Sequence, residues 1–366
     1  MDSTDEQKNI PPRPHAVRPA NGRRPASGNP PAGGVPAPGK GKSDSPARRG
    51  GALTAPLLVF CIFALLLIVR LAGPAVFDRD NEYILLTVVQ VLIFMLPAAV
   101  YLKITHTGLH RLRLIPFGVN HLLLVISAVI AAASGSLLLD FAASGYESFS
   151  ETYTLYGAFA ATAGSDAAHT AYIITAYAAL PALCEEFVFR AILCAEYESD
   201  GGSFSAVVLT ALWFAMLHFD LRSFGVYFFS GVLLALTLYA TRSFFAAFAV
   251  HFGYNLVSLF GAPLWRTVYD VGGKTLYFLV IGSALLLSLF AFCGESARLY
   301  GSYADRDLSS AYRTQTSPPE APAGGRRDGG ITGAVRRAFA GNMRAFLAPS
   351  ALLCYLFYVA VMLFLR

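Results

Sequence analysis

Three groups of polar residues stand inside apolar stretches of the chain, and they are the residues that could do chemistry. A charged or strongly hydrogen-bonding side chain at membrane depth costs several kcal/mol unless it is paired or used. Two carboxylates, a guanidinium, two imidazoles and an amide in such stretches predict one buried reaction centre. The six residues are Glu185, Glu186, Arg190, His218, His251 and Asn255.

The two adjacent carboxylates are predicted to have different roles. On a helix each residue advances by about 100°, so Glu186 and Arg190, four residues apart, share a face and can form an ion pair. Glu185 points about 100° away from Glu186. The spacing predicts a structural Glu186–Arg190 pair beside a free Glu185. Pro181 can kink this helix, and a backbone carbonyl that it frees inside a membrane needs a partner or water.

The two histidines suit proton transfer and hydrogen bonding. A neutral His218 can accept a proton from water or orient it. His251 and Asn255 are four residues apart, so both can donate hydrogen bonds to a developing oxyanion. At about 1.5 Å per residue, Glu185 and His218 would differ in depth by ~10–15 Å in perpendicular helices. We therefore expect the helix of Glu185 to be shifted, starting near Tyr177, or its partner to tilt.

The composition is typical of a polytopic membrane protein. Hydrophobic residues make up 55% of the 366 and charged residues 14%, whereas a soluble domain has about 25% charged residues. The net charge of +5 is small, and no basic run alternates with aromatic residues, which argues against a nucleic-acid partner. The cysteines are scattered, so we interpret them as packing residues and predict no disulfide framework: Cys61, Cys184, Cys194, Cys293 and Cys354.

The apolar stretches predict an all-α fold, a membrane bundle of about eight transmembrane helices followed by one C-terminal helix. Residues 1–50 hold ten of the 20 prolines and are predicted to be a disordered, basic cytoplasmic tail. The helical core is assigned to residues 51–293, with the motif region at 168–260. A flexible cytoplasmic linker, 294–345, and a C-terminal helix, 346–366, would follow. The nine predicted spans are 52–71, 83–101, 121–141, 171–194, 204–219, 224–239, 244–260, 275–293 and 346–365.

Loop charge predicts the orientation of these helices. The N-terminal tail, the loop with Lys103, Arg111 and Arg113, and the stretch from Arg298 to Arg344 are basic. The intervening loops at 78–82 and 147–166 are mostly acidic. Because basic loops stay in the cytoplasm, we expect a multi-pass protein of the cell membrane with a cytoplasmic N-terminus. With nine spans the C-terminus would lie outside.

The three polar groups resemble the motifs of the CAAX protease and bacteriocin-processing family. This family is also described as type II CAAX prenyl endopeptidase, abortive-infection or lysostaphin-resistance-protein-A-like. Its pattern is E-E-x-x-x-R, then F-x-x-x-H, then H-x-x-x-N. Here the motifs stand in that order as EEFVFR (185–190), FAMLH (214–218) and HFGYN (251–255). The resemblance covers about residues 168–260.

The resemblance implies an intramembrane endopeptidase of the glutamate type. Glu185 would be the general base, His218 its partner in activating water, and His251 with Asn255 the oxyanion stabilisers. Glu186, Arg190 and Phe214 would support them. The implied substrate is a membrane-associated peptide or protein within the lipid bilayer, processed as CAAX proteins are or during peptide maturation. No cofactor and no metal ligand are expected.

Three other readings remain open at this stage. A zinc-dependent intramembrane metalloprotease could use Glu185 or Glu186 with His218 and His251 as ligands, although the chain has no H-E-x-x-H. A proton-coupled transporter also uses intramembrane Glu and His, but it predicts inverted repeats, which the sequence does not display. A non-catalytic membrane scaffold would keep its function when Glu185 is changed to Gln.

Overall fold

The computed structural model describes residues 51–76, 82–152, 167–305 and 340–364. All regular secondary structure in these ranges is helical, which confirms the all-α prediction. The predicted N-terminal tail, 1–50, lies outside the described residues. The predicted linker begins at residue 294, but helix continues to Asp305 and resumes at Ala340. The remainder of that linker, 306–339, is outside the described ranges.

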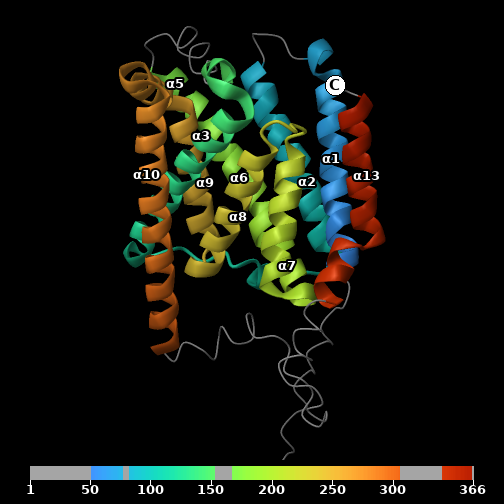
Figure 1. Ribbon diagram of the computed structural model, residues 1–366. Helices are drawn as coiled ribbons and strands as arrows, with labels where there is room; N and C mark the ends of the chain where they lie inside the picture. Colours follow the sequence, from blue (N-terminus) through green and yellow to red (C-terminus); the bar gives the residue numbers. More distant parts are fainter. Residues whose placement is uncertain (1–50, 77–81, 153–166, 306–339, 365–366) are drawn as a thin grey trace, which may run out of the picture. The chain divides into compact units, whose positions relative to one another are not determined.

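Each predicted apolar stretch is helical over most of its length (Figure 1). Seven helical elements of the described ranges surround the motif region, and two of them are kinked at a glycine, α3 at Gly145 and α10 at Gly273. Two short 3₁₀ turns, η1 (Leu109–Leu112) and η2 (Val119–His121), precede the third. The seven are α1 (Gly51–Val76), α2 (Glu82–Thr105), α3 (Leu122–Thr152), α8 (Phe224–Thr241), α9 (Phe244–Phe260), α10 (Ala262–Asp305) and α13 (Pro349–Phe364).

The motif region begins with one continuous helical arm built from short pieces. The pieces are α5 (Ala167–Ile174), η3 (Thr175–Ala179), α6 (Leu180–Glu186), η4 (Phe187–Leu193) and the first part of α7 (Cys194–Leu217). The segments η3 and η4 are π-helical, a rare geometry that is frequent at functional sites. The chain reverses at Gly202, whose φ of 81° is a backbone conformation that favours glycine. The rest of α7 returns as a second arm.

The chain is a multi-pass membrane protein. Five helices of the described ranges are long and apolar enough to cross a bilayer, and the bent pair Ala340–Phe346 with α13 makes a sixth. Gly202–Leu217 and α9 are apolar but shorter, and the stretch predicted at 171–194 is divided among five elements. The total of nine spans therefore stays a prediction.

The elements around the motif region are held by side-chain and backbone contacts. The helix α13, expected to be an appendage, packs along α1 (Figure 1), where Cys354 Sγ donates to the carbonyl of Pro56 at 3.1 Å. A Tyr355 ring also stacks on Trp213 of α7 with centroids 4.9 Å apart. On its other side α7 meets α8 closely, because a Cβ placed on Gly231 would lie 2.9 Å from the Ala211 Cα. Small residues permit such close helix crossings in membranes.

Candidate active site

The two arms joined at Gly202 bring Glu185 and His218 to the same level. Cross-arm contacts are spaced evenly about the turn: Cys194 Sγ lies 3.6 Å from Thr210 Oγ1, and the Phe189 and Phe214 rings have centroids 5.5 Å apart. Antiparallel helices rise equally, at 1.5 Å per residue. Glu185 and His218 are 17 and 16 residues from the turn, so their depths match. The arm begins at Ala167 rather than near Tyr177, and its extension past Cys194 removes the expected depth conflict.

The predicted ion pair between Glu186 and Arg190 is present. Arg190 Nη1 lies 3.1 Å from Glu186 Oε1, and both side chains are completely buried. Arg190 Nη2 also donates to the backbone carbonyl of Gly231 at 3.1 Å, and its guanidinium lies 4.7 Å from the centre of the Phe214 ring. The pair therefore ties the first motif to α8 and to the second motif, as a structural role requires.

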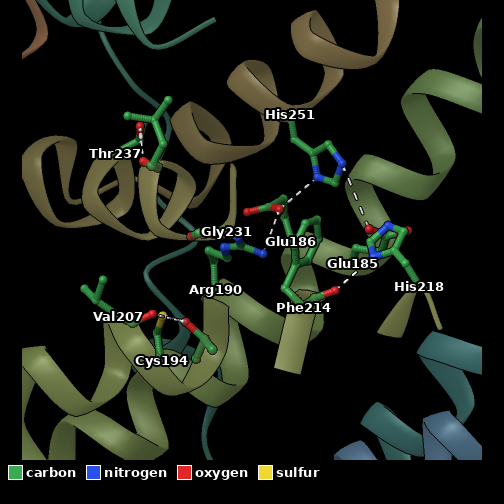
Figure 2. A network of polar contacts seen from close by, with 12 residues as sticks. Glu185, Glu186, Arg190, Cys194, Val207, Phe214, His218, Gly231, Thr237 and His251 are labelled. Carbon is green, nitrogen blue, oxygen red and sulfur yellow. Dashed lines mark hydrogen bonds and ion pairs between the residues drawn. The ribbon is translucent and has the colours of Figure 1, made fainter. Parts of the chain in front are cut away.

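The imidazole of His251 lies between the two adjacent carboxylates (Figure 2). Its Nδ1 is 2.9 Å from Glu186 Oε1, and its Nε2 is 4.0 Å from Glu185 Oε2. An ionised carboxylate only accepts hydrogen bonds, so Nδ1 carries the proton in the bond to Glu186. The Nε2 atom is consequently the nitrogen that faces Glu185. The distance of 4.0 Å is too long for a direct hydrogen bond and suits one water molecule that contacts both atoms.

Glu185 is the carboxylate left outside the ion pair with Arg190. Its side chain is 10% exposed. Besides the approach of His251, Glu185 accepts one long hydrogen bond, 3.4 Å, from Gln90 Nε2 of α2. Sequence reasoning missed Gln90. The signal was available, because Gln90 is an uncharged polar residue in the middle of the otherwise apolar stretch 83–101.

His218 directly follows the last residue of α7, Leu217, and is held by two neighbours. Its Nδ1 lies 2.9 Å from the carbonyl oxygen of Phe214, and because a carbonyl cannot donate, Nδ1 carries the proton and Nε2 is free to accept. The Tyr227 ring of α8 stacks on the imidazole, with centroids 3.6 Å apart and an interplanar angle of 9°. Tyr227 was not predicted, since nothing in the sequence distinguishes it from other aromatic residues of that helix.

Phe214 joins the two imidazoles of the site. Its ring makes T-shaped contacts with both histidine rings, with centroids 5.2 Å from His218 and 5.6 Å from His251. The Arg190 guanidinium covers the same ring. The phenylalanine of the second motif therefore fills the space between the motifs, which explains its place in the pattern.

Asn255 reaches the same arm as His251, at another point. Its Nδ2 donates to the backbone carbonyl of Ala178 at 3.3 Å. Ala178 belongs to the π-helical segment η3, just before Pro181. The bond ties the third motif to the π-helical segment that precedes Pro181. The side chain keeps one further N–H to donate.

One comparison with known proteins found a match. The family model described as type II CAAX prenyl endopeptidase Rce1-like matches residues 167–257. No curated protein and no solved structure matches the chain. The matched segment begins with α5 and ends within α9, so it contains all three motifs and both imidazoles. It supports a peptidase of the CAAX protease kind and confirms the resemblance seen in the motifs: residues 167–257 are similar to the Rce1-like type II CAAX prenyl endopeptidases.

Proposed function

We propose that this protein is an intramembrane endopeptidase that hydrolyses membrane-associated peptides or proteins with water activated by Glu185. One observation carries the proposal. Of two adjacent buried carboxylates, Glu186 is paired with Arg190 at 3.1 Å, while Glu185 forms no ion pair with Lys or Arg among the described residues and faces His251 Nε2 at 4.0 Å. An acid kept apart from its neighbour's counter-ion is available to take a proton from water.

The proposed reaction has three steps. Glu185 takes one proton from a water molecule, with the free Nε2 of His218 accepting the water's second hydrogen in a hydrogen bond. The water oxygen attacks the carbonyl carbon of the peptide bond and forms a tetrahedral oxyanion. When the C–N bond breaks, the proton held by Glu185 passes to the leaving amine. The products are a carboxylic acid and an amine, so atoms and charges balance.

His251 and Asn255 supply the donors for the oxyanion. The Nδ1 proton of His251 is engaged by Glu186, so its Nε2 donates only when the ring is an imidazolium. Asn255 uses one N–H on Ala178 and has a second for the oxyanion. Removing one such donor typically costs about 10²–10³ in kcat.

The proposed mechanism uses no cofactor. The zinc alternative requires about three protein ligands around an open position. Among the described residues, no group of three His, Cys, Asp or Glu side chains gathers closely enough to hold a metal ion. His251 Nδ1 is instead bonded to Glu186, and His218 Nδ1 to a backbone carbonyl.

The test is a proteomic comparison of membrane peptides between cells with the wild-type protein and cells with Glu185→Gln. The change removes the base and keeps the shape, so uncleaved substrates should accumulate. Glu196→Gln is the matched control, because it makes the same chemical change on the same arm, where Glu196 accepts a hydrogen bond from Thr107 at 3.4 Å. Identical peptide profiles for wild type and Glu185→Gln would refute the protease and favour a non-catalytic scaffold.

We also propose that the N-terminus is cytoplasmic, on the evidence of the basic loops. Lys103 and Arg111 lie at or just after the end of α2, and Arg298 lies near the end of α10. These are the helix ends that the positive-inside rule places in the cytoplasm. A tag at the N-terminus should be protected from added protease in intact cells, and a tag after residue 366 should be cut. Both tags on one side would contradict a chain with nine spans.

A further inference from the structure

The imidazole of His218, which is predicted to be catalytic, lies just beyond the end of a helix, where the helix itself does not fix the orientation of the side chain. α7 ends at Leu217, and the next residue after His218, Phe219, has a φ of 47°, a left-handed conformation that non-glycine residues rarely adopt. His218 is thus the first residue of a tight turn that leads into α8 at Phe224. A side chain at the end of a helix needs contacts from elsewhere to keep one orientation.

The hydrogen bond to Phe214 fixes only part of that orientation. It joins His218 Nδ1 to a carbonyl of the same helix at 2.9 Å, which selects the tautomer and anchors one edge of the ring. A single bond at one ring atom still allows the plane to rock about that bond. The rocking would move Nε2, the atom on the opposite side that must meet water.

Tyr227 removes the remaining freedom. Its ring lies almost parallel to the imidazole, at 9°, with centroids 3.6 Å apart, so one face of His218 is covered by a flat surface. Phe214 meets the imidazole edge-on, with an interplanar angle of 67°. Tyr227 itself lies in the first turn of α8, where its backbone N–H donates to Ser223 at 3.1 Å. The stack therefore joins both ends of the turn between α7 and α8.

We propose that Tyr227, which lies outside all three motifs, is a positioning residue that sets the ring plane of His218 by stacking. The inference rests on the function proposed above. The aromatic ring of Tyr227 is what acts, because the contact is face to face and none of the hydrogen bonds found in the described residues involves the Tyr227 hydroxyl. A Phe at this position should therefore replace Tyr, and an aliphatic residue should not.

The experiment measures cleavage of the native membrane peptides that accumulate with Glu185→Gln, by pulse labelling in membranes. A misplacement of about 1 Å can cost about 10²-fold in rate, so Tyr227→Leu should slow cleavage by about 10- to 100-fold. Tyr227→Phe should restore the rate to within about threefold of wild type, as retained stacking requires. If Tyr227 only stabilised the fold, the Phe and Leu variants would cleave at the same rate when equal amounts of folded protein are compared.

The matched control is Tyr355→Leu. Tyr355 also stacks on a residue of α7, Trp213, with centroids 4.9 Å apart, but it touches neither imidazole. Both Leu variants are compared at equal amounts of folded protein, judged by thermal unfolding in detergent. Any of three results would overturn the proposal. Tyr227→Leu could cleave at the wild-type rate, the Phe and Leu variants at position 227 could lose equal activity, or Tyr355→Leu could lose as much activity as Tyr227→Leu. If Glu185→Gln itself changes no peptide, the protease assignment has failed first, and the two failures are told apart.

Discussion

Replacing Arg190 by Met tests whether the ion pair of the first motif is structural. Met keeps an unbranched apolar stem of similar length and removes the charge. The Glu186 carboxylate would then remain completely buried, with His251 Nδ1 as its remaining charged or polar partner among the contacts of the site. The carbonyl of Gly231 and the face of the Phe214 ring would also lose the guanidinium.

The size of the effect follows from this burial. Removing one partner of a buried ion pair costs about 3–5 kcal/mol, because the other charge stays unpaired in a medium of low dielectric. In the double variant Glu186→Gln with Arg190→Met no charge is stranded. Its amide oxygen can still accept from His251 Nδ1. We therefore expect the double variant to be more stable than Arg190→Met, with a coupling of about 1–3 kcal/mol.

The measurement is the free energy of unfolding in mixed micelles, followed by tryptophan fluorescence. Trp213 is fully buried in α7 and one residue from Phe214, so it reports on the site. Glu185→Gln is the control that changes a neighbouring carboxylate without breaking the ion pair. The reasoning is wrong if Arg190→Met destabilises by less than about 1 kcal/mol, the range of exposed ion pairs, or if the double variant is the less stable of the two.

Three further outcomes are expected. Gly231→Ala should destabilise by about 1–3 kcal/mol in the same unfolding assay, because the new Cβ would meet the Ala211 backbone at 2.9 Å, whereas Gly225→Ala, with open space around it, should not. Asn255→Ala should lower cleavage by about 10²–10³ and lower stability by only about 1 kcal/mol, which separates the oxyanion role from the bond to Ala178. The rate of cleavage should be unchanged after dialysis against a chelator. A lower rate that added zinc restores would favour a zinc-dependent metalloprotease instead.

The sequence alone determined the fold class and the chemical groups of the site. The chain has 55% hydrophobic residues, gathered in long apolar stretches. Inside a membrane a helix satisfies the backbone N–H and C=O groups of such a stretch, so the helical stretches could be found without a structure. The Glu186–Arg190 pair was predictable for a local reason, because residues four apart on one helix are neighbours. The helix ends were less predictable. The predicted span ends at residue 293, whereas α10 continues to Asp305 through more polar residues.

The relation between the three motifs was decided by the tertiary structure. His251 lies 65 residues from Glu186, and which of its nitrogens faces which carboxylate depends on helix packing and on side-chain rotation. The π-helical segment before Glu185 likewise contacts a distant residue, since Ala178 accepts a hydrogen bond from Asn255. Helical periodicity carries no information on such contacts between distant segments.

Gln90 and Tyr227 show the same limit most clearly. Gln90 donates a hydrogen bond to Glu185, which is 95 residues away in the sequence. Tyr227 stacks on His218 across a turn in which Phe219 has a left-handed backbone conformation. Because this position is not a glycine, the sequence does not indicate the turn. Residue types and spacing specify which groups can react, because the chemistry is intrinsic to the side chains. Their orientation comes from packing between helices that are distant in sequence, and only the folded chain fixes it.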